Sequence, residues 1–419
     1  MKHKKSLLSL ALLMAMPHLG MAAETAQASS LQEAITDGKL TANFRLRYEN
    51  VDQDGKTETA NALTLRSVIG WTTKPYYNFG VTAEAYGTSP LVDDYNDLSK
   101  GVTSPANAKY PVVADPEEYG IYQLFISYTG IPDSTVKLGR QSAILDNWRF
   151  IGDVRFRQNW QVMDGISFTN KSLPKTSIYL AHFDRVTQIT TKLQEGNIEI
   201  GNIKYSITPT TSITGYGYLI DWDRSTLQAT SNKTFGIRLD GSEKINTSWK
   251  ALYTAEYAKQ SDYKDGSSAI DNDYYRVGAG AGYGDWFLRL DQEKLSGNDK
   301  GKAFQTPLGT NHLFQGWADV FLTTPNEGIK DTMLIAGGKF MGATIKSEYH
   351  WIDSDRDFAK VGGGLGDKYG TEFDLGVYYK FTKQISASAE YANFSEGDKY
   401  AAGRKTDIQK FWLTGMYTF

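Results

Sequence analysis

The chain of 419 residues contains no Cys, which excludes disulfides, thiolate metal sites and thiol catalysis. Its 45 Lys and Arg are balanced by 48 Asp and Glu, so the excess of positive charge typical of nucleic-acid binding is absent. The 26 Tyr, 19 Phe and 40 Gly leave open either several soluble domains or one long all-β barrel.

The first predicted element is a secretory signal peptide over residues 1–23. A basic start precedes an apolar run at residues 7–16, and small residues then allow cleavage between residues 22 and 28. The apolar run is shorter than the about 20 residues that a membrane-spanning helix needs. Residues 24–38 are expected to form a short periplasmic segment, with a short helix at 31–37 that plugs or caps the structure behind it.

Predicted strands follow from residue 39 onward, because apolar and polar side chains alternate with a period of two. In the first of them, Leu40, Phe44 and Leu46 occupy one face, while Arg45 and Arg47 occupy the other. The predicted strands span residues 39–50, 61–74, 77–87, 119–129, 135–145, 161–169, 175–184, 197–206, 212–222, 232–241, 248–260, 272–283, 286–296, 330–340, 343–353, 370–381, 384–394 and 407–419.

The connections between these strands alternate between tight turns and long loops such as 88–118 and 297–329. This alternation predicts an all-β fold, a transmembrane antiparallel barrel over residues 39–419 with about 18 strands, short periplasmic turns and long extracellular loops. The soluble alternatives are a propeller or a large sandwich, but the sequence lacks a repeated blade motif. Phe419 ends an alternating strand and resembles the signal that engages the barrel assembly machinery. We therefore expect a location in the outer membrane, among lipid and lipopolysaccharide.

If the apolar faces contact lipid, the polar faces line a water-filled lumen that filters solutes by charge. The alternative for each residue is an ordinary wall charge that serves only solvation and assembly. The residues predicted to line the pore from the strands are Arg45, Arg47, Arg66, Arg238, Arg276, Arg289, Glu348, Glu372, Asp374 and Glu390.

Residues 138–164 form the most unusual stretch, because four arginines alternate with aromatic residues there. Arginine forks bind carboxylates, and flat aromatic faces stack on sugars or on guanidinium groups. We expect this loop to fold inward and to narrow the pore; the alternative is a rim loop that contacts lipopolysaccharide phosphates. Its predicted pore residues are Arg140, Asp146, Arg149, Arg155 and Arg157.

Three stretches resemble the alginate export family of Gram-negative outer-membrane porins. They are GKLTANFRLRYENVDQDG (38–55), KLGRQSAILDNWRFIGDVRFRQN (137–159) and GWADVFLTTPNEGIKD (316–331), the last followed by YHWIDSDRD and by YGTEFDLGVYYKFT (369–382). The resemblance implies a monomeric barrel, and it implies transport roles for Arg45, Arg66, Arg140, Asp146, Arg149 and Arg157.

The mixed charge of the expected lumen argues against alginate itself, and the family resemblance implies passive diffusion of small hydrophilic, anion-preferring solutes. Export of an acidic, alginate-like polysaccharide is the alternative function.

We predict neither catalysis nor a cofactor. After removal of the signal peptide only His182, His312 and His350 remain, and no Ser or Asp forms a recognisable catalytic partnership with them. A calcium loop at residues 353–357 would need Gly and Glu where the sequence has Phe358 and Gly364, so no metal site is expected.

Overall fold

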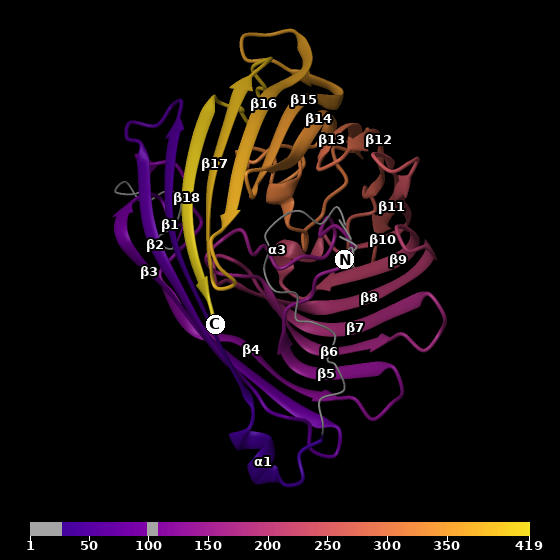
Figure 1. Cartoon of the computed structure of the whole chain (residues 1–419). Coiled ribbons are helices and arrows are strands. Elements are labelled where there is room, and N and C mark those ends of the chain that lie inside the picture. The colour runs from indigo at the N-terminus through magenta and orange to yellow at the C-terminus, as the bar shows by residue number, and fades with distance from the viewer. Residues whose placement is uncertain (1–26, 99–107) are drawn as a thin grey trace.

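The strands close into a single antiparallel barrel (Figure 1). The computed structural model describes residues 27–98 and 108–419. The predicted signal peptide, its cleavage region up to residue 26 and part of the predicted loop 88–118 lie outside the described residues.

The barrel wall has 18 strands, each hydrogen-bonded to its neighbours in chain order. They are β1 (Lys39–Gln53), β2 (Ala60–Thr72), β3 (Phe79–Asp94), β4 (Glu118–Tyr128), β5 (Ser134–Gln141), β6 (Val162–Asn170), β7 (Thr176–Thr187), β8 (Leu193–Thr208), β9 (Thr211–Trp222), β10 (Asn232–Lys244), β11 (Trp249–Asp262), β12 (Asp271–Tyr283), β13 (Trp286–Ser296), β14 (Gly328–Phe340), β15 (Ala343–Ala359), β16 (Leu365–Lys380), β17 (Ile385–Glu396) and β18 (Ile408–Thr418).

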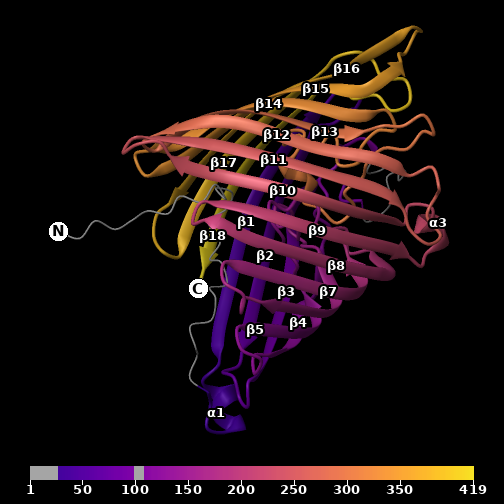
Figure 2. The ribbon, with the colours of Figure 1, turned by 90° about the vertical axis from the view of Figure 1, so that its right-hand side faces the viewer.

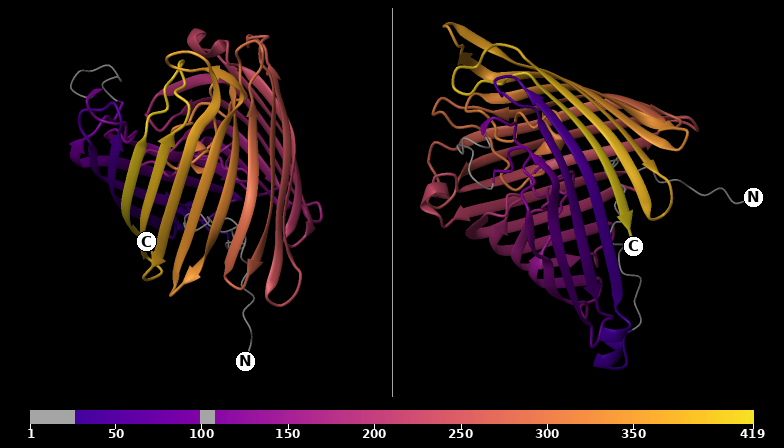
Figure 3. Two further views of the ribbon diagram at one scale, coloured as in Figure 1. Left: turned by 90° about the horizontal axis from the view of Figure 1, so that it is seen from above. Right: turned by 90° about the vertical axis from the view of Figure 1, so that its left-hand side faces the viewer.

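Closure comes from β1, which pairs with β2 on one side and with β18 on the other. Arg45, for example, lies opposite Arg66 of β2 and opposite Met416 of β18. In Figure 3 the yellow end of the chain lies beside the indigo strand β1. The predicted fold class is confirmed, since each predicted strand overlaps one of the observed strands in the same order.

The predicted boundaries differ most where a strand meets a loop. The fifth predicted strand ran to residue 145, but β5 ends at Gln141. There Ser142 leaves the ladder: its amide donates to Gln123 at 3.1 Å and its hydroxyl to Asp153 at 3.0 Å. In contrast, β15 and β16 extend beyond their predicted ends and form a long hairpin (Figure 2).

The two faces of the wall have opposite character. On β1 the side chains of Leu40 and Leu46 are 48% and 44% exposed, while those of Arg45 and Arg47 are 1% and 2% exposed. On β18 Leu413 is exposed and Trp412 is fully buried. Apolar side chains therefore cover the outside, as in barrels that contact lipid, and the charged positions face the lumen.

The described helices are short and lie outside the strands: α1 (Leu31–Thr36), α3 (Ser225–Gln228) and the 3-10 helix η1 (Asn311–Leu313). Among the described residues, no helix has the length and hydropathy needed to cross a membrane. Helix α1 lies at the short-turn end of the barrel (Figure 2), where Lys74 of the β2–β3 turn binds Asp37 at 2.8 Å and Glu33 at 3.4 Å. The helix thus lies beside the wall and does not plug the lumen.

Two long connections fold into the lumen and determine what the barrel encloses (Figure 1). The first inner loop comprises residues 142–161, between β5 and β6, and the second inner loop comprises residues 297–327, between β13 and β14. Together they bury a core of aromatic residues inside the barrel, including Phe156, Phe304 and Trp317. The predicted inward folding of residues 138–164 is confirmed for this first inner loop.

Candidate functional site

The first inner loop is anchored by two arginines of strand β1. Arg45 donates from Nε to the side-chain oxygen of Gln158 at 2.7 Å and from Nη1 to the carbonyl of Arg155 at 2.7 Å. Its other Nη atom donates to the carbonyl of Arg157, and Arg47 donates to the carbonyl of Phe156. Both guanidinium groups are buried, so they hold the loop backbone against the wall.

Arg157 joins the first inner loop to the wall and to the second inner loop. Its guanidinium group donates to Glu49 of β1 at 2.9 Å and to Asp319 of the second inner loop at 2.8 Å. A further carboxylate, Asp115, lies 3.7 Å away. Since the Arg157 side chain is only 7% exposed, these charge-assisted contacts lie in a low-dielectric environment and act as a latch between the two loops.

An aromatic stack reinforces this latch. The ring of Phe156 stacks on His312 with centroids 3.3 Å apart, and it meets the Trp412 ring of β18 at 5.6 Å. His312 Nδ1 lies 2.7 Å from Asp319, and Lys410 of β18 lies 3.0 Å from the same carboxylate. Asp319 therefore receives partners from both inner loops and from the wall.

The latch should resist mild acid. Burial alone would raise the pKa of Asp319, but Lys410, His312 and Arg157 outweigh it and hold that pKa well below its usual range. A lowered pKa stabilises the folded state above the unfolded value of about 3.9, and this stabilisation is lost only as the pH falls through the lower folded value. We therefore expect single-channel conductance to show no latch opening between pH about 7 and about 4.

An Asp319→Asn variant is the reference for this experiment, because it lacks the carboxylate at every pH. If the wild-type channel acquired the conductance of that variant while the pH was still above about 4, the assigned ionisation of Asp319 would be wrong.

Arg66 of β2 is held differently from the other wall arginines. Its side chain is 0% exposed, and none of its nitrogen atoms has a hydrogen-bond partner within the described residues. The guanidinium carbon instead lies 3.7 Å from the Trp160 ring centroid and 5.4 Å from that of Tyr122. Cation–π contacts thus replace the ion pairs found at Arg157.

The opposite wall carries a second group of buried ion pairs. Arg149 of the first inner loop binds Glu293 of β13 at 3.0 Å and Gln315 of the second inner loop at 3.1 Å. The remaining arginines pair along the strands: Arg276 and Arg289 with Asp291 at 2.9 and 2.7 Å, and Arg238 with Glu256 at 3.3 Å and with Asp240. Most guanidinium charge on this side is therefore neutralised within the barrel.

The other residues predicted to line the pore lie in varied places. Asp146 is exposed in the lumen and accepts from Asn202 at 2.7 Å, and Arg155 is 19% exposed beside Asp153.

Arg140 lies on the outward face and not in the lumen as predicted. It shares its side of β5 with Leu138, which is 57% exposed, and it binds Asp164 at 2.8 Å. Glu390 accepts from Tyr378 at 2.7 Å, while Glu348, Glu372 and Asp374 are buried together. Roles of these residues in transport stay predictions.

Five lumen lysines were missed by the sequence reasoning. Near the short-turn end, inward positions carry lysines that are exposed or half-buried: Lys204, Lys244, Lys250, Lys339 and Lys380. Lys204 follows the buried Asn202 by two residues, and Lys250 precedes the buried Leu252 by two. In the described part of the chain none of the five forms an ion pair. These lysines could have been identified by continuing the alternation of inward and outward positions to the polar ends of the predicted strands.

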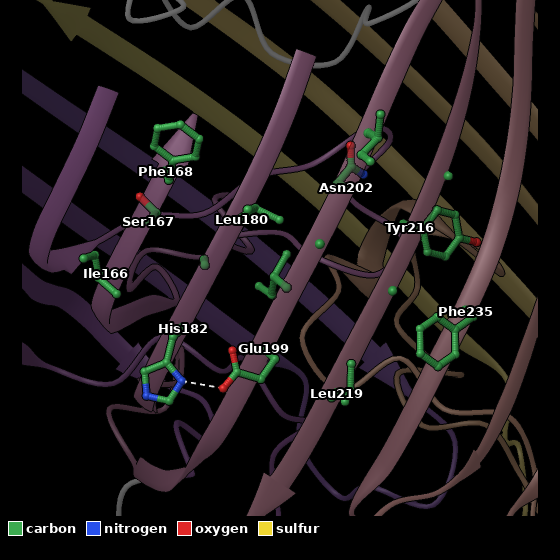
Figure 4. Close-up of a pocket in the computed structure, with 16 residues that line it drawn as sticks. Ile166, Ser167, Phe168, Leu180, His182, Glu199, Asn202, Tyr216, Leu219 and Phe235 are labelled. Atoms are coloured by element: carbon green, nitrogen blue, oxygen red, sulfur yellow. Dashed lines mark hydrogen bonds and ion pairs between the residues drawn. The ribbon is translucent and has the colours of Figure 1, made fainter. Parts of the chain in front are cut away.

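A groove among the described residues lies on the outside of the barrel and is not part of the lumen. It has a volume of about 740 Å³ and crosses strands β6 to β10 (Figure 4). Leu180 and Phe235 line it with side chains 47% and 54% exposed. The paired His182 and Glu199, 2.7 Å apart, lie at its edge. This groove belongs to the lipid-facing surface.

Comparison with known proteins extends this description. OccAB3 of Acinetobacter baumannii superimposes with a TM-score of 0.72 at 14% identity, over 92% of this chain and 100% of that chain. OpdQ of Pseudomonas aeruginosa superimposes with a TM-score of 0.69 at 17% identity, over 93% of this chain and 99% of that chain. OpdK of P. aeruginosa, solved with vanillate, gives 0.68 at 13% identity, over 92% and 99%.

The fold is that of an outer-membrane porin. No protein-family model matches the sequence, and no curated protein does. The resemblance to the alginate export family therefore stays a prediction.

Proposed function

We propose that this chain is an outer-membrane porin for the passive diffusion of small hydrophilic, anion-preferring solutes. The observation that carries the proposal is the imbalance of free charge in the lumen. The arginines and carboxylates of the wall are largely paired with one another, whereas the five lysines at the short-turn end have no ion-pair partner among the described residues. Unpaired positive charge in a narrow passage raises the local concentration of anions.

The part of the first inner loop that remains exposed supports a small carboxylate as solute. Arg155 lies 5.6 Å from the ring centroid of Trp148 and 5.3 Å from that of Trp160, and all three side chains are partly exposed. Nε and Nη2 of Arg155 already donate to Asp153, so a planar solute carboxylate would bind at the remaining edge of the guanidinium group, beside the aromatic faces. OpdK, which shares the fold, was solved with vanillate, an aromatic carboxylate of this kind.

Export of an acidic polysaccharide is the less favoured function. The two inner loops are latched to each other and to the wall by buried ion pairs, which leaves less room for a polymer than for a small solute. The comparisons give no support for alginate.

The proposal also retains the other features predicted from the sequence. It describes a monomer without enzymatic activity, surrounded by lipid and lipopolysaccharide and inserted by the barrel assembly machinery through Phe419. A hydrolase activity lost in His350→Ala would contradict the absence of catalysis.

Charge reversal of the lumen lysines tests the anion preference. In a Lys204→Glu, Lys250→Glu double variant we expect the anion-to-cation permeability ratio to fall by roughly tenfold, the lower end of what charge focusing in a cleft provides. The ratio is measured from reversal potentials across planar bilayers with a salt gradient. Salt should stay near about 0.1 M, where the Debye length is about 10 Å and screening is incomplete.

Lys383→Glu is the matched control, because Lys383 is exposed in the β16–β17 turn and its reversal changes net charge without changing the lumen. An unchanged reversal potential in the double variant, with the barrel folded and conducting, would remove the basis for anion preference.

A further inference from the structure

A buried cluster of three carboxylates and one imidazole lies on β15 and β16, beneath the second inner loop. Glu348 and His350 alternate on β15, and the register places them opposite Asp374 and Glu372 of β16. One ligand atom each from Glu348, His350 and Asp374 lies within 4.8 Å of the others. Their side chains are at most 5% exposed.

The imidazole of His350 is oriented as in metal sites. Its Nδ1 lies 2.8 Å from Oδ2 of Asp331 on β14, an arrangement in which the carboxylate fixes the tautomer and ring direction. Its Nε2 then points at the cluster, 3.4 Å from Asp374 and 3.7 Å from Glu348. Within the described residues, this Nε2 has no hydrogen-bond partner.

The charge of the group is unbalanced. Asp331, Glu348, Glu372 and Asp374 bring four carboxylates together. Lys346 pairs with Glu348 at 2.7 Å, and His350 adds a second positive charge only when it is protonated. In the part of the chain that the structure describes, Oε2 of Glu372 and Oδ1 of Asp374 also lack hydrogen-bond partners. Buried carboxylates are retained when they are paired or coordinate metals, so this group requires a further cation or shared protons.

The second inner loop covers the cluster and donates hydrogen bonds to its carboxylates. Trp317 Nε1 donates to Glu348 at 2.8 Å, and the amide of Ala318 donates to Glu372 at 2.6 Å. The amide of Trp317 lies 3.4 Å from Asp374. These donors orient the carboxylates so that Oε2 of Glu348 and Oδ2 of Asp374 also face Nε2 of His350.

We propose that Glu348, His350 and Asp374 bind one divalent transition-metal ion, with Asp331 as the carboxylate that orients His350. One imidazole nitrogen and two carboxylates form a donor set for ions such as Zn²⁺ or Mn²⁺. Mg²⁺ and Ca²⁺ prefer oxygen ligands alone. The ion would join β15 to β16 directly below the second inner loop.

Binding is tested with the whole folded protein in detergent, freed of metal by a chelator and titrated with Zn²⁺ by calorimetry. We expect one high-affinity ion per chain, and the loss of that site in His350→Ala and in Asp374→Asn. His182→Ala is the matched control, because His182 also contacts two carboxylates, Glu199 and Asp184, but lies on the outer face. This variant should retain the site.

A second measurement needs no change within the cluster. Cu²⁺ bound at one equivalent to the His182→Ala protein should show nitrogen hyperfine splitting in its electron paramagnetic resonance spectrum. The proposal is overturned if Zn²⁺ does not bind stoichiometrically, if both cluster variants bind like the wild type, or if the Cu²⁺ spectrum shows oxygen ligands only. In those cases the carboxylates share protons instead.

Discussion

Replacing Arg157 with Ala should enlarge the channel. The substitution leaves Glu49 and Asp319 without the guanidinium group that each contacts below 3 Å, and breaking a buried pair costs about 3–5 kcal/mol. The cost is relieved if the two inner loops separate and water reaches the carboxylates. Single-channel recordings in planar bilayers should therefore show a higher conductance and more frequent transitions than the wild type.

Arg155→Ala controls for the loss of a positive charge from the same loop. Among the described residues the ion pair of Arg155 stays within its own loop, with Asp153 two residues away, and its side chain is partly exposed, so we expect little change in loop position. If Arg157→Ala formed a folded barrel with wild-type conductance, the latch would not determine the width of the passage.

Replacing Arg66 with Met should leave the free energy of unfolding unchanged or raise it, whereas removing Arg157 breaks a buried ion pair and lowers it. The buried guanidinium group has no hydrogen-bond partner among the described residues, and cation–π contacts with Trp160 and Tyr122 only partly replace its hydration. Exchanging a buried charge for an apolar side chain of similar volume is neutral or stabilising by about 1–4 kcal/mol. Equilibrium unfolding in urea should thus give an equal or higher midpoint for Arg66→Met.

Arg149→Met is the matched comparison, since Arg149 is equally buried but binds Glu293 at 3.0 Å. This variant should be less stable by about 3–5 kcal/mol, because an uncompensated carboxylate remains. Strong destabilisation by Arg66→Met would instead indicate a partner for its guanidinium group, such as a bound anion.

The strands of the wall could be predicted from the sequence because apolar and polar side chains alternate within each strand. In β1 and β18 every second side chain is apolar and outward, so strand positions and parity follow from local alternation. The ends of β5 and β15 could not be predicted in this way. Gln141 ends β5 because Gln123 and Asp153 take over the hydrogen bonds of Ser142, and these contacts depend on the folded loop.

The site was predicted less completely, since its contacts join distant parts of the chain. The arginine-rich loop could be identified by composition, but the stacking of Phe156 on His312 joins residues that only the closed barrel brings together. Arg140 was expected in the lumen, whereas its register with Leu124, a residue 50% exposed, places it outward. His350 was considered only as a catalytic residue, because its pairing with Glu372 requires the register of β15 and β16.

The way in which β1 holds the first inner loop has a consequence for how such channels diversify. Arg45 and Arg47 bind the peptide carbonyls of residues 155–157, groups that every amino acid supplies. Exchanging a side chain at residues 155–157 therefore leaves these backbone hydrogen bonds in place, while the side chains of Arg157 and Gln158 add sequence-dependent contacts. Foreign loop sequences grafted between β5 and β6 should therefore stay attached to β1 if they keep Arg157 and Gln158, which offers a route to altered solute preferences.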